Sequence, residues 1–399
     1  MTTGHRGLWR PGDRAAASYH YLPVEVTPGS AGLRVVLDYD RDAGVLDLGC
    51  FGPDGFRGWS GGARSEFVIT QAAATPGYLS GAPEPGQWQV VLGLHRVPPG
   101  GLPWRVTAEV GPVEVPALPE PPPVPQRPPR RELPTVPGHT WYAGDLHAHT
   151  VHSDGSLTVD ALARLAAGQG LDFLAVTDHN TVSHHPLLPA AGAASGVVLL
   201  PGQEVTTDRG HANAYGDIGW VDFRQPADSW LARVDERGGL LSVNHPLAAD
   251  CAWRQPLTNR PPLAEVWHWT WADRRWGGPL AWWQAWGYDT IPVGGSDFHS
   301  PDQGRPLGVP TTWVACEELT VDGVLAGLRA GRVAISANRD APVLLRVGDE
   351  LVAVDADGAL LTGPDGRRRV VRGDLARFPS EPGPHWLEDG ETQVLAVTA

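Results

Sequence analysis

The sequence of 399 residues predicts an α/β domain preceded by an antiparallel β-sandwich and followed by a small β-rich appendage. Three observations predict this arrangement. Short runs that alternate apolar and polar residues, separated by Gly and Pro, fill residues 18–115. Ten prolines then fall within residues 116–137. From Thr140 onward, strand-like and helix-like runs alternate, which is typical of an α/β barrel or a doubly wound sheet.

Residues 1–116 are predicted to form the β-sandwich. Alternation of apolar and polar residues over five to seven positions is the pattern of a strand with one buried face. Such runs separated by turn residues indicate two packed antiparallel sheets. The clearest of these runs are residues 33–39, 66–70, 88–93 and 104–110.

Residues 117–138 are predicted to be a Pro-rich linker. Proline at this density favours polyproline II, a semi-rigid spacer between domains. A ligand for an SH3-type domain is the alternative interpretation of the same composition.

Residues 139–340 are predicted to form the α/β domain. The run 159–168 follows Thr158, a candidate helix N-cap, and the runs 227–237 and 321–330 each end at a glycine, as helices commonly do. Short strands with Asp-Gly turns predict that residues 341–399 form the C-terminal appendage. The strand-like runs of the α/β domain are 141–146, 172–177, 197–201, 240–243, 264–267 and 290–294.

Composition excludes several classes of function. The chain has 31 basic and 45 acidic residues, a formal net charge of −14, and no lysine. Without lysine, a P-loop nucleotide site, Schiff-base catalysis and a protein kinase are excluded. The acidic balance argues against nucleic acid and anionic membranes as partners. The first residues lack the apolar region of a signal peptide, and no run of about 18 apolar residues occurs, so we expect a cytoplasmic protein.

The three cysteines do not indicate a site. Cys50, Cys251 and Cys316 are far apart and form no C-x-x-C pair. Neither a disulfide framework nor a thiolate metal site is therefore expected.

Histidines gather in the α/β domain, where eleven of the 15 lie between His139 and His299. Five predicted strands end in His, Asp or Glu, and the carboxyl ends of barrel strands meet on one face, so these side chains are expected to converge. One H-x-H pair alone is weak evidence for a metal site, but five strand ends with His, Asp or Glu are strong evidence. Imidazole and carboxylate ligands without thiolate suit Zn, Mn, Fe or Co. His147 and His149 lie two residues apart and so face the same way on an extended chain, as do Asp297 and His299.

These strand ends resemble the motifs of the PHP (polymerase and histidinol phosphatase) superfamily of metal-dependent hydrolases over roughly residues 140–336. With the sandwich in front, the chain is similar to the carbaryl-hydrolase-like (CehA/McbA-type) branch, on the stretches YHYLPVEV, GFRGWSGG and ATPGYLSG. The resemblance implies a distorted (β/α)7 TIM-like barrel that holds two or three divalent metal ions (Zn, Mn or Fe). The matching motifs are HAHTVHSDG (147–155), TDHN (177–180), GQEVTT with GHANAYG (202–216), NHP (244–246) and GSDFH (295–299).

The resemblance also implies which residues bind the metals, and no ligand position is missing. One metal would take His147, His149, Glu204 and Asp297. A second would take Glu204 as a bridge together with His211 and His245, and a third would take Asp154, His179 and His299.

The function expected from these residues is that of a metal-dependent phosphoesterase acting on a small, anionic phosphomonoester or phosphodiester. Paired cations lower the pKa of a bridging water, and the resulting hydroxide attacks phosphorus. Glu204, Asp297 and His299 are the expected catalytic residues, with Asp297 or a nearby His taking the proton. Hydrolysis of an ester, amide or carbamate is the alternative, and a non-catalytic, metal-stabilised binding module is a third interpretation. The sequence does not specify the oligomeric state.

Substrate contacts are expected from arginine and tryptophan. Arg209 and Arg305 lie close to ligand positions, although each also suits a loop salt bridge. Eight of the 17 tryptophans fall within residues 253–286, which suits either an aromatic wall for an apolar leaving group or core packing. Of these, Trp269 and Trp271 are expected to face the site.

The remaining histidines of the domain receive no ligand role. His152 is expected either to contact substrate or to face solvent on its loop. His184, His185 and His268 are expected to support the ligands or to lie at the surface.

Overall fold

The computed structural model describes residues 1–399, which form two compact units. The first unit contains Met1–Glu120 and two short later segments, Val151–Asp154 and Asp178–Pro186. The second unit contains Pro121–Thr150, Gly155–Thr177 and Leu187–Ala399. The domain limits at residues 116, 138 and 340 stay predictions.

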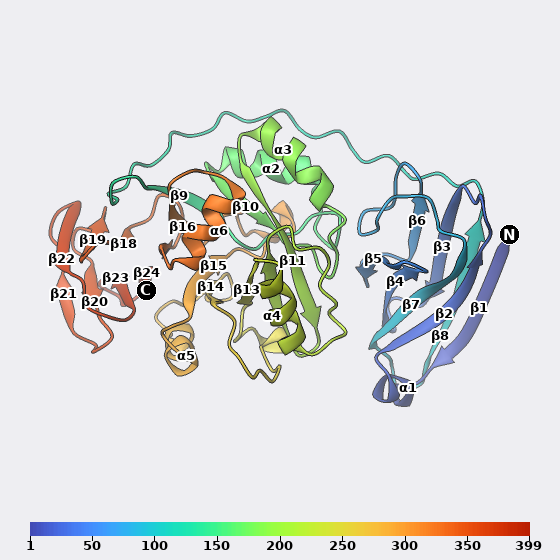
Figure 1. The fold of residues 1–399 in the computed structure, drawn as a ribbon. Coiled ribbons are helices and arrows are strands. Elements are labelled where there is room, and N and C mark those ends of the chain that lie inside the picture. Colours follow the sequence, from blue (N-terminus) through green and yellow to red (C-terminus); the bar gives the residue numbers. More distant parts are fainter. The chain divides into compact units, whose positions relative to one another are not determined.

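The first unit is built on two four-stranded antiparallel sheets, with strand orders β1-β8-β3-β6 and β2-β7-β4-β5 (Figure 1). The β1 strand, which the alternation pattern did not single out, pairs with β8 along its whole length. The elements are β1 (Thr2–Trp9), α1 (Pro11–Ala16), β2 (Tyr19–Val26), β3 (Gly32–Tyr39), β4 (Val45–Gly52), β5 (Gly55–Gly61), β6 (Glu66–Thr70), β7 (Gly86–Arg96) and β8 (Leu102–Val110).

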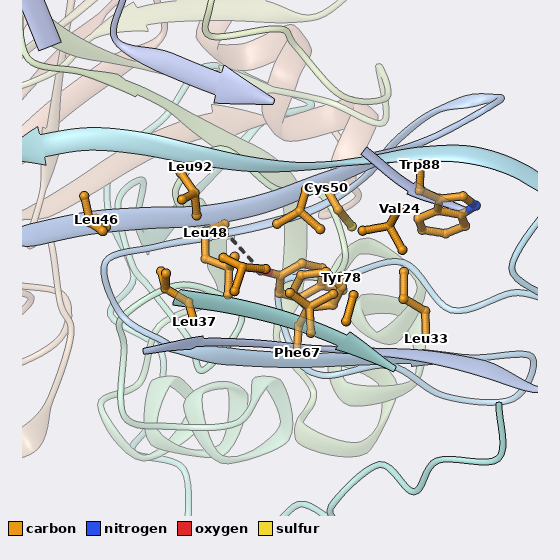
Figure 2. Close-up of a cluster of buried hydrophobic side chains, with 14 of the residues drawn as sticks. Val24, Leu33, Leu37, Leu46, Leu48, Cys50, Phe67, Tyr78, Trp88 and Leu92 are labelled. Carbon is orange, nitrogen blue, oxygen red and sulfur yellow. Dashed lines mark hydrogen bonds between the residues drawn. The ribbon is translucent and has the colours of Figure 1, made fainter. Parts of the chain in front are cut away.

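Apolar side chains from both sheets form one core, as Figure 2 shows. Leu33 and Leu37 of β3 are buried opposite Leu46 and Leu48 of β4, and the alternation along each strand supplies this inward face. Tyr78 lies among them, with its hydroxyl donating to the Leu48 carbonyl at 3.1 Å. The expected antiparallel β-sandwich is therefore present.

One carboxyl group of the first unit, that of Asp47, has a raised pKa. The Asp47 side chain on β4 lies over Gly93 of β7, where any added side chain would meet it. Burial raises the pKa of Asp47 from 3.8 to about 7. Since the folded carboxyl binds a proton more tightly than the unfolded one, the folded state loses stability as pH rises from about 4 to 7.

The Asp47→Asn variant is therefore expected to be more stable than the parent at pH 8, by about 1–3 kcal/mol. The gain should shrink to about 1 kcal/mol or less at pH 4.5, where Asp47 is protonated in the fold but mostly ionised in the unfolded chain. Thermal unfolding of the full chain at both pH values measures it. The exposed Asp38 of β3 provides the control, and an equal gain for Asp38→Asn or a pH-independent gain for Asp47→Asn would contradict the explanation.

The second unit is organised around a mixed sheet that runs in the order β15-β14-β13-β12-β11-β10-β9-β16-β17 before its C-terminal strands. The pairs β9–β10, β10–β11, β13–β14 and β14–β15 are parallel. The strands are β9 (Thr140–Asp145), β10 (Phe173–Val176), β11 (Val198–Thr207), β12 (Gly210–Tyr215), β13 (Leu240–Val243), β14 (Leu263–His268), β15 (Ile291–Gly295), β16 (Thr311–Cys316) and β17 (Val333–Ser336).

The α/β prediction is confirmed as a mixed α/β fold, but the strands are not all parallel. The β11 strand continues to Thr207, and the chain then turns back through Asp208 and Arg209 into β12. Because a two-residue connection can join only antiparallel strands, β11 and β12 pair antiparallel. The β16 strand also pairs antiparallel with β9. Closure of the sheet into a seven-fold barrel stays a prediction.

Helices flank this sheet, and the predicted helix runs are confirmed to within one residue at each end. Thr158 is the N-cap of α2, with its hydroxyl accepting from the Ala161 N–H at 3.2 Å. Thr320 caps α6 in the same way. No helix combines the length and the apolar character needed to cross a membrane. The helices are α2 (Val159–Gly168), α3 (Leu188–Ser195), α4 (Ala227–Glu236), α5 (Gly278–Trp286) and α6 (Val321–Arg329).

The C-terminal β strands belong to the second unit, and the hydrogen bonds between β24 and β17 join them to its mixed sheet. The last strand, β24, pairs antiparallel with β17, which extends the mixed sheet through β23, β20 and β21 (Figure 1). A separate three-stranded sheet has the order β18-β19-β22. The strands are β18 (Val343–Val347), β19 (Glu350–Val354), β20 (Leu360–Thr362), β21 (Arg368–Val370), β22 (Leu375–Pro379), β23 (His385–Glu388) and β24 (Val394–Thr398).

The proline-rich segment is anchored to the second unit from Pro121 onward. Arg127 Nη2 and Arg130 Nε lie 2.7 and 3.2 Å from Asp172 Oδ1, and the Asp172 side chain is only 2% exposed. Asp172 Oδ2 also accepts from the Ala143 N–H at 2.9 Å. The Asp172 carboxylate thus joins the proline-rich segment to β9.

The Asp172→Ala variant is expected to lower the free energy of unfolding by about 2–4 kcal/mol, because a buried N–H and two guanidinium groups lose their acceptor. Chemical unfolding of the full chain measures this loss. Asp235→Ala, at the exposed end of α4, should change stability by less than about 0.5 kcal/mol. Equal effects of the two substitutions would contradict the anchoring role.

Candidate metal centre

Most predicted ligands of the second unit lie just after the ends of its strands, and Glu204 and His211 lie within β11 and β12. His147 and His149 follow β9, and Asp297 and His299 follow β15. These two segments pair side by side, because the His149 N–H donates to the Phe298 carbonyl at 2.9 Å. His245 follows β13, whereas Glu204 and His211 lie on the two strands of the β11–β12 hairpin, where Glu204 pairs with Asn213 and His211 pairs with Thr206.

Four of these residues form the centre of the site. His147, His149, Glu204 and Asp297 each offer a ligand atom, and these atoms all lie within 4.8 Å of one another. Asp297 Oδ1 lies 3.2 Å from His147 Nε2 and 3.0 Å from His149 Nε2. His147, His149 and Glu204 are fully buried, and the Asp297 side chain is 18% exposed. The structure thus brings together the residues expected for the first metal.

Glu204 also connects this group to the residues expected for the second metal. Its Oε1 atom lies 3.1 Å from His211 Nδ1 and 3.2 Å from His245 Nε2. The same oxygen accepts from Asn244 Nδ2 at 2.8 Å. A carboxylate with several imidazoles around it can bind a cation on either side, as the bridging role requires.

Two buried residues of the cluster were not predicted as members. Glu265 of β14 has its Oε1 atom 3.0 Å from His147 Nδ1, and its Oε2 atom accepts from the His245 N–H at 2.8 Å. His268, at the end of β14, has its Nε2 atom 3.3 Å from Asp297 Oδ2 and is 5% exposed. The alternative that His268 lies at the surface is therefore wrong. Its signal was available, because His268 also stands at a strand end.

Asp145 supports the site through the backbone and does not contact an imidazole. Its carboxylate accepts from the backbone N–H groups of His147 at 3.1 Å, Ser296 at 3.0 Å and Gly308 at 2.8 Å. Burial raises the pKa of Asp145 despite these hydrogen bonds. Asp145 therefore fixes the two ligand-bearing segments relative to each other.

The charges in the cluster are strongly coupled. Burial lowers the pKa of His147, but Glu204, Asp297 and Glu265 outweigh burial and hold that pKa well above its ordinary value. Burial likewise opposes the ionised form of Asp297, yet His147 and His149 hold its pKa well below the usual range. The same carboxylates that attract protons to these rings attract divalent cations.

The backbone at two ligand positions is unusual. His245 has φ of +25° and Asp297 has φ of +50°, in the left-handed region that L residues rarely adopt. Such conformations gather at functional sites, where the surrounding structure holds them. Gly295 is needed nearby, because a side chain there would collide with the Glu265 carboxylate and His147.

The remaining predicted ligands belong to different units. Asp154 and His179 lie in the first unit, with Asp154 Oδ1 3.5 Å from His179 Nε2. His299 lies in the second unit, where its ring stacks on His149 with centroids 4.1 Å apart. A third metal held by all three residues stays a prediction.

His152 does not face solvent. It is 6% exposed, and its Nδ1 atom lies 2.7 Å from Ser183 Oγ within the first unit. Burial lowers the pKa of His152 to about 4. The solvent-facing alternative for this histidine is therefore wrong.

The predicted substrate residues differ in their surroundings. Arg209 is exposed, and its Nη2 atom donates to the Arg254 carbonyl at 3.3 Å. The Arg305 guanidinium carbon lies 3.2 Å from the centroid of the Trp269 ring. Their roles toward substrate stay predictions.

A cavity of about 400 Å³ opens beside the cluster within the second unit. His245, His268 and Asp297 are among its polar lining residues, and Trp269 and Trp271 are among its apolar ones. Trp267 and Trp283 are buried in a hydrophobic core, as the core-packing interpretation expects, whereas other tryptophans line the cavity. Contact of these tryptophans with an apolar leaving group stays a prediction.

The residues present fit divalent cations. Buried imidazoles and carboxylates without thiolate are the donors that Zn, Mn and Fe take. His147 Nε2 is buried and makes no hydrogen bond, although two carboxylate oxygens lie within 3.3 Å of it. Its Nδ1 atom faces Glu265, which is the arrangement that fixes a metal-binding imidazole.

Comparison with known proteins gives short sequence matches and distant structural ones. No protein-family model matches the chain. The chain is 40% identical over 65 residues to the 5'-3' exoribonuclease Rnm of Salmonella typhimurium and 42% identical over 67 residues to that of Escherichia coli. Each match covers 16% of this chain, which spans only 22% of the length of each relative.

Solved structures with similarity to the chain include metal-dependent hydrolases. A two-domain protein from Bacteroides vulgatus that contains a predicted PHP-like metal-dependent phosphoesterase is 18% identical with a TM-score of 0.42, covering 69% of this chain and 91% of that one. An amidohydrolase from Chromobacterium violaceum is 15% identical with a TM-score of 0.31, covering 41% and 89%. The description of the first of these neighbours names the superfamily that the sequence motifs resemble. The carbaryl-hydrolase-like branch stays a prediction.

Proposed function

We propose that the chain is a metal-dependent hydrolase of the PHP type, a phosphoesterase for small phosphomonoesters or phosphodiesters. The observation that carries the proposal is the buried group of His147, His149, Glu204 and Asp297, whose ligand atoms lie within 4.8 Å of one another. Hydrolysis of a phosphoester requires cations near the phosphoryl oxygens, and a chain without lysine must obtain them from arginine or metals.

The proposed metal ligands are those that the resemblance implies. His147, His149 and Asp297 would hold the first cation with Glu204, and His211 and His245 would hold the second with the same carboxylate. Asp154, His179 and His299 would hold a third. When bound, paired divalent cations make water nucleophilic at neutral pH and stabilise charge on the phosphoryl oxygens.

The protein's own groups would then handle the proton and the orientation of the site. Asp297 or His299 would accept the proton of the attacking water, and His268 Nε2, 3.3 Å from Asp297 Oδ2, lies where it would orient that carboxylate. Glu265 would hold His147 through Nδ1. Arg305 and Arg209 would contact the anionic substrate.

A second candidate is hydrolysis of an ester, amide or carbamate at the same centre. The tryptophan-lined cavity favours this candidate, because apolar walls suit an uncharged organic substrate. The exoribonucleases that match a short part of the chain act on RNA by name. The net charge of −14 argues against RNA as the substrate here.

Purified full chain, stripped by chelation and reloaded with Zn, Mn or Fe, tests these candidates on a panel of substrates. We expect turnover of p-nitrophenyl phosphate or bis-p-nitrophenyl phosphate above that of p-nitrophenyl acetate and of a 5'-phosphorylated RNA oligonucleotide. Preference for the acetate would support the second candidate. Full metal occupancy without turnover of any substrate would instead favour the binding module.

A further inference from the structure

The cavity beside the cluster is lined by two chemically different sets of residues. Its volume of about 400 Å³ falls within the range of small-molecule sites. His245, His268 and Asp297 are among its polar lining residues, whereas four tryptophans, Pro279 and Leu247 are among its apolar ones. We call the part of the cavity beside these tryptophans its tryptophan end. The tryptophan end has no described role in the metal centre.

We infer that the tryptophan end of this cavity takes an aromatic ring that is bonded directly to the ester oxygen of the substrate. The inference rests on the proposed phosphoesterase function and names its substrate class, an aryl phosphate. Hydrolysis would form a bond from the water oxygen to phosphorus and break the bond from phosphorus to the aryl oxygen. The aryl oxygen leaves with the electron pair and takes up a proton, which gives a phenol and inorganic phosphate.

The first argument is adjacency. His268 lies beside both sets of lining residues, since its Nε2 atom lies 3.3 Å from Asp297 Oδ2 and its ring centroid lies 5.4 Å from that of Trp269. A substrate ring that packs against Trp269 is therefore separated from the proposed ligand Asp297 by about the width of one side chain, that of His268. This spacing suits an ester oxygen attached to the ring itself, whereas a nucleotide would place a ribose in between.

The second argument is that the tryptophan walls are held in place. Trp271 Nε1 donates to the Trp276 carbonyl at 2.7 Å, and the Trp271 ring packs edge-on against Trp267 at 5.2 Å. Trp282 stacks on Trp286 with centroids 5.0 Å apart. Aromatic surfaces fixed in this way bind a flat ring with little loss of side-chain entropy.

The third argument concerns charge. Tryptophan walls also suit an organic cation, but a guanidinium already lies over one of these rings. The Arg305 guanidinium carbon lies 3.2 Å from the centroid of the Trp269 ring. Its positive charge disfavours a cationic ligand beside Trp269.

Binding of indan-5-ol, a two-ring phenol, to the metal-free full chain tests the inference without turnover. Trp276 is 60% exposed, so Trp276→Ala should fold normally. We expect Trp276→Ala and Trp269→Ala to weaken binding by roughly tenfold, measured by calorimetric titration. Trp220, which lies outside the cavity lining, gives the control Trp220→Ala, which should bind like the parent. No binding, or equal binding by all four proteins, would overturn the inference.

Turnover by the metal-loaded protein provides an independent comparison. Indan-5-yl phosphate and phenyl phosphate have leaving groups of similar basicity, so the ratio of their kcat/KM values reports ring binding. The ratio should favour the two-ring ester and fall roughly tenfold in Trp276→Ala but not in Trp220→Ala. A higher kcat/KM for choline phosphate or a 5'-mononucleotide would overturn the aryl assignment. No turnover of any phosphoester would overturn the proposed function alone, because indan-5-ol binding still tests the cavity.

Discussion

Asp297→Asn is expected to reduce phosphoester hydrolysis by about a thousandfold or more and to lower the bound metal. Asp297 lies close to three imidazoles of the cluster: its Oδ1 atom lies 3.2 Å from His147 and 3.0 Å from His149, and its Oδ2 atom lies 3.3 Å from His268. The amide keeps the shape but removes the charge that a cation requires. His147→Ala should have the same consequence, because it deletes an imidazole from the same group.

Elemental analysis and steady-state kinetics of the purified variants measure both effects. Asp302→Asn is the matched control, because Asp302 is exposed on the same loop, five residues further along. It should retain parental metal content and turnover. The sandwich should stay folded in every variant, because its core draws on residues of the first unit alone. Retained activity in Asp297→Asn or His147→Ala would contradict the assignment of the site.

Glu265→Gln is expected to weaken metal binding by about 10–100-fold while leaving every proposed ligand in place. Glu265 is buried and meets His147 Nδ1 at 3.0 Å on one side and the His245 backbone N–H at 2.8 Å on the other. Its negative charge makes the His147 ring a stronger ligand and fixes the ring's orientation. The amide preserves the shape but loses that charge.

Metal affinity by competition with a fluorescent chelator measures this effect, and activity at saturating metal should recover most of the lost turnover. Recovery distinguishes a positioning residue from a ligand, whose loss added metal does not restore. Glu317→Gln, at an exposed position after β16, should bind metal like the parent. An unchanged affinity in Glu265→Gln would exclude the positioning role.

Strand ends explain why much of the centre was predictable from sequence. His147, Asp297 and His245 each follow a run that forms a strand, and the carboxyl ends of the parallel strands lie at one edge of a sheet. The spacing of two residues put His147 and His149 on one face. The Thr158 cap likewise specified the start of α2. These features depend on local sequence, which is why local patterns revealed them.

Features that depend on distant partners were not predictable in the same way. Glu265 lies inside an apolar strand, and only the fold brings it to His147, 118 positions away in the sequence. The β11–β12 hairpin was missed because the expected strand ended at Pro201, although β11 continues to Thr207. His268 was given no ligand role although it directly follows the expected strand 264–267. Its contact with Asp297 depends on the fold and not on the local sequence.

The most direct test of the central claim is a titration of chelator-stripped protein with Zn, Mn or Fe, following bound metal and hydrolysis of p-nitrophenyl phosphate together. We expect no turnover in the stripped chain, and turnover that rises with occupancy and saturates at two or three ions per chain. Turnover in the stripped protein, or full occupancy without turnover of any substrate in the panel, would contradict the account.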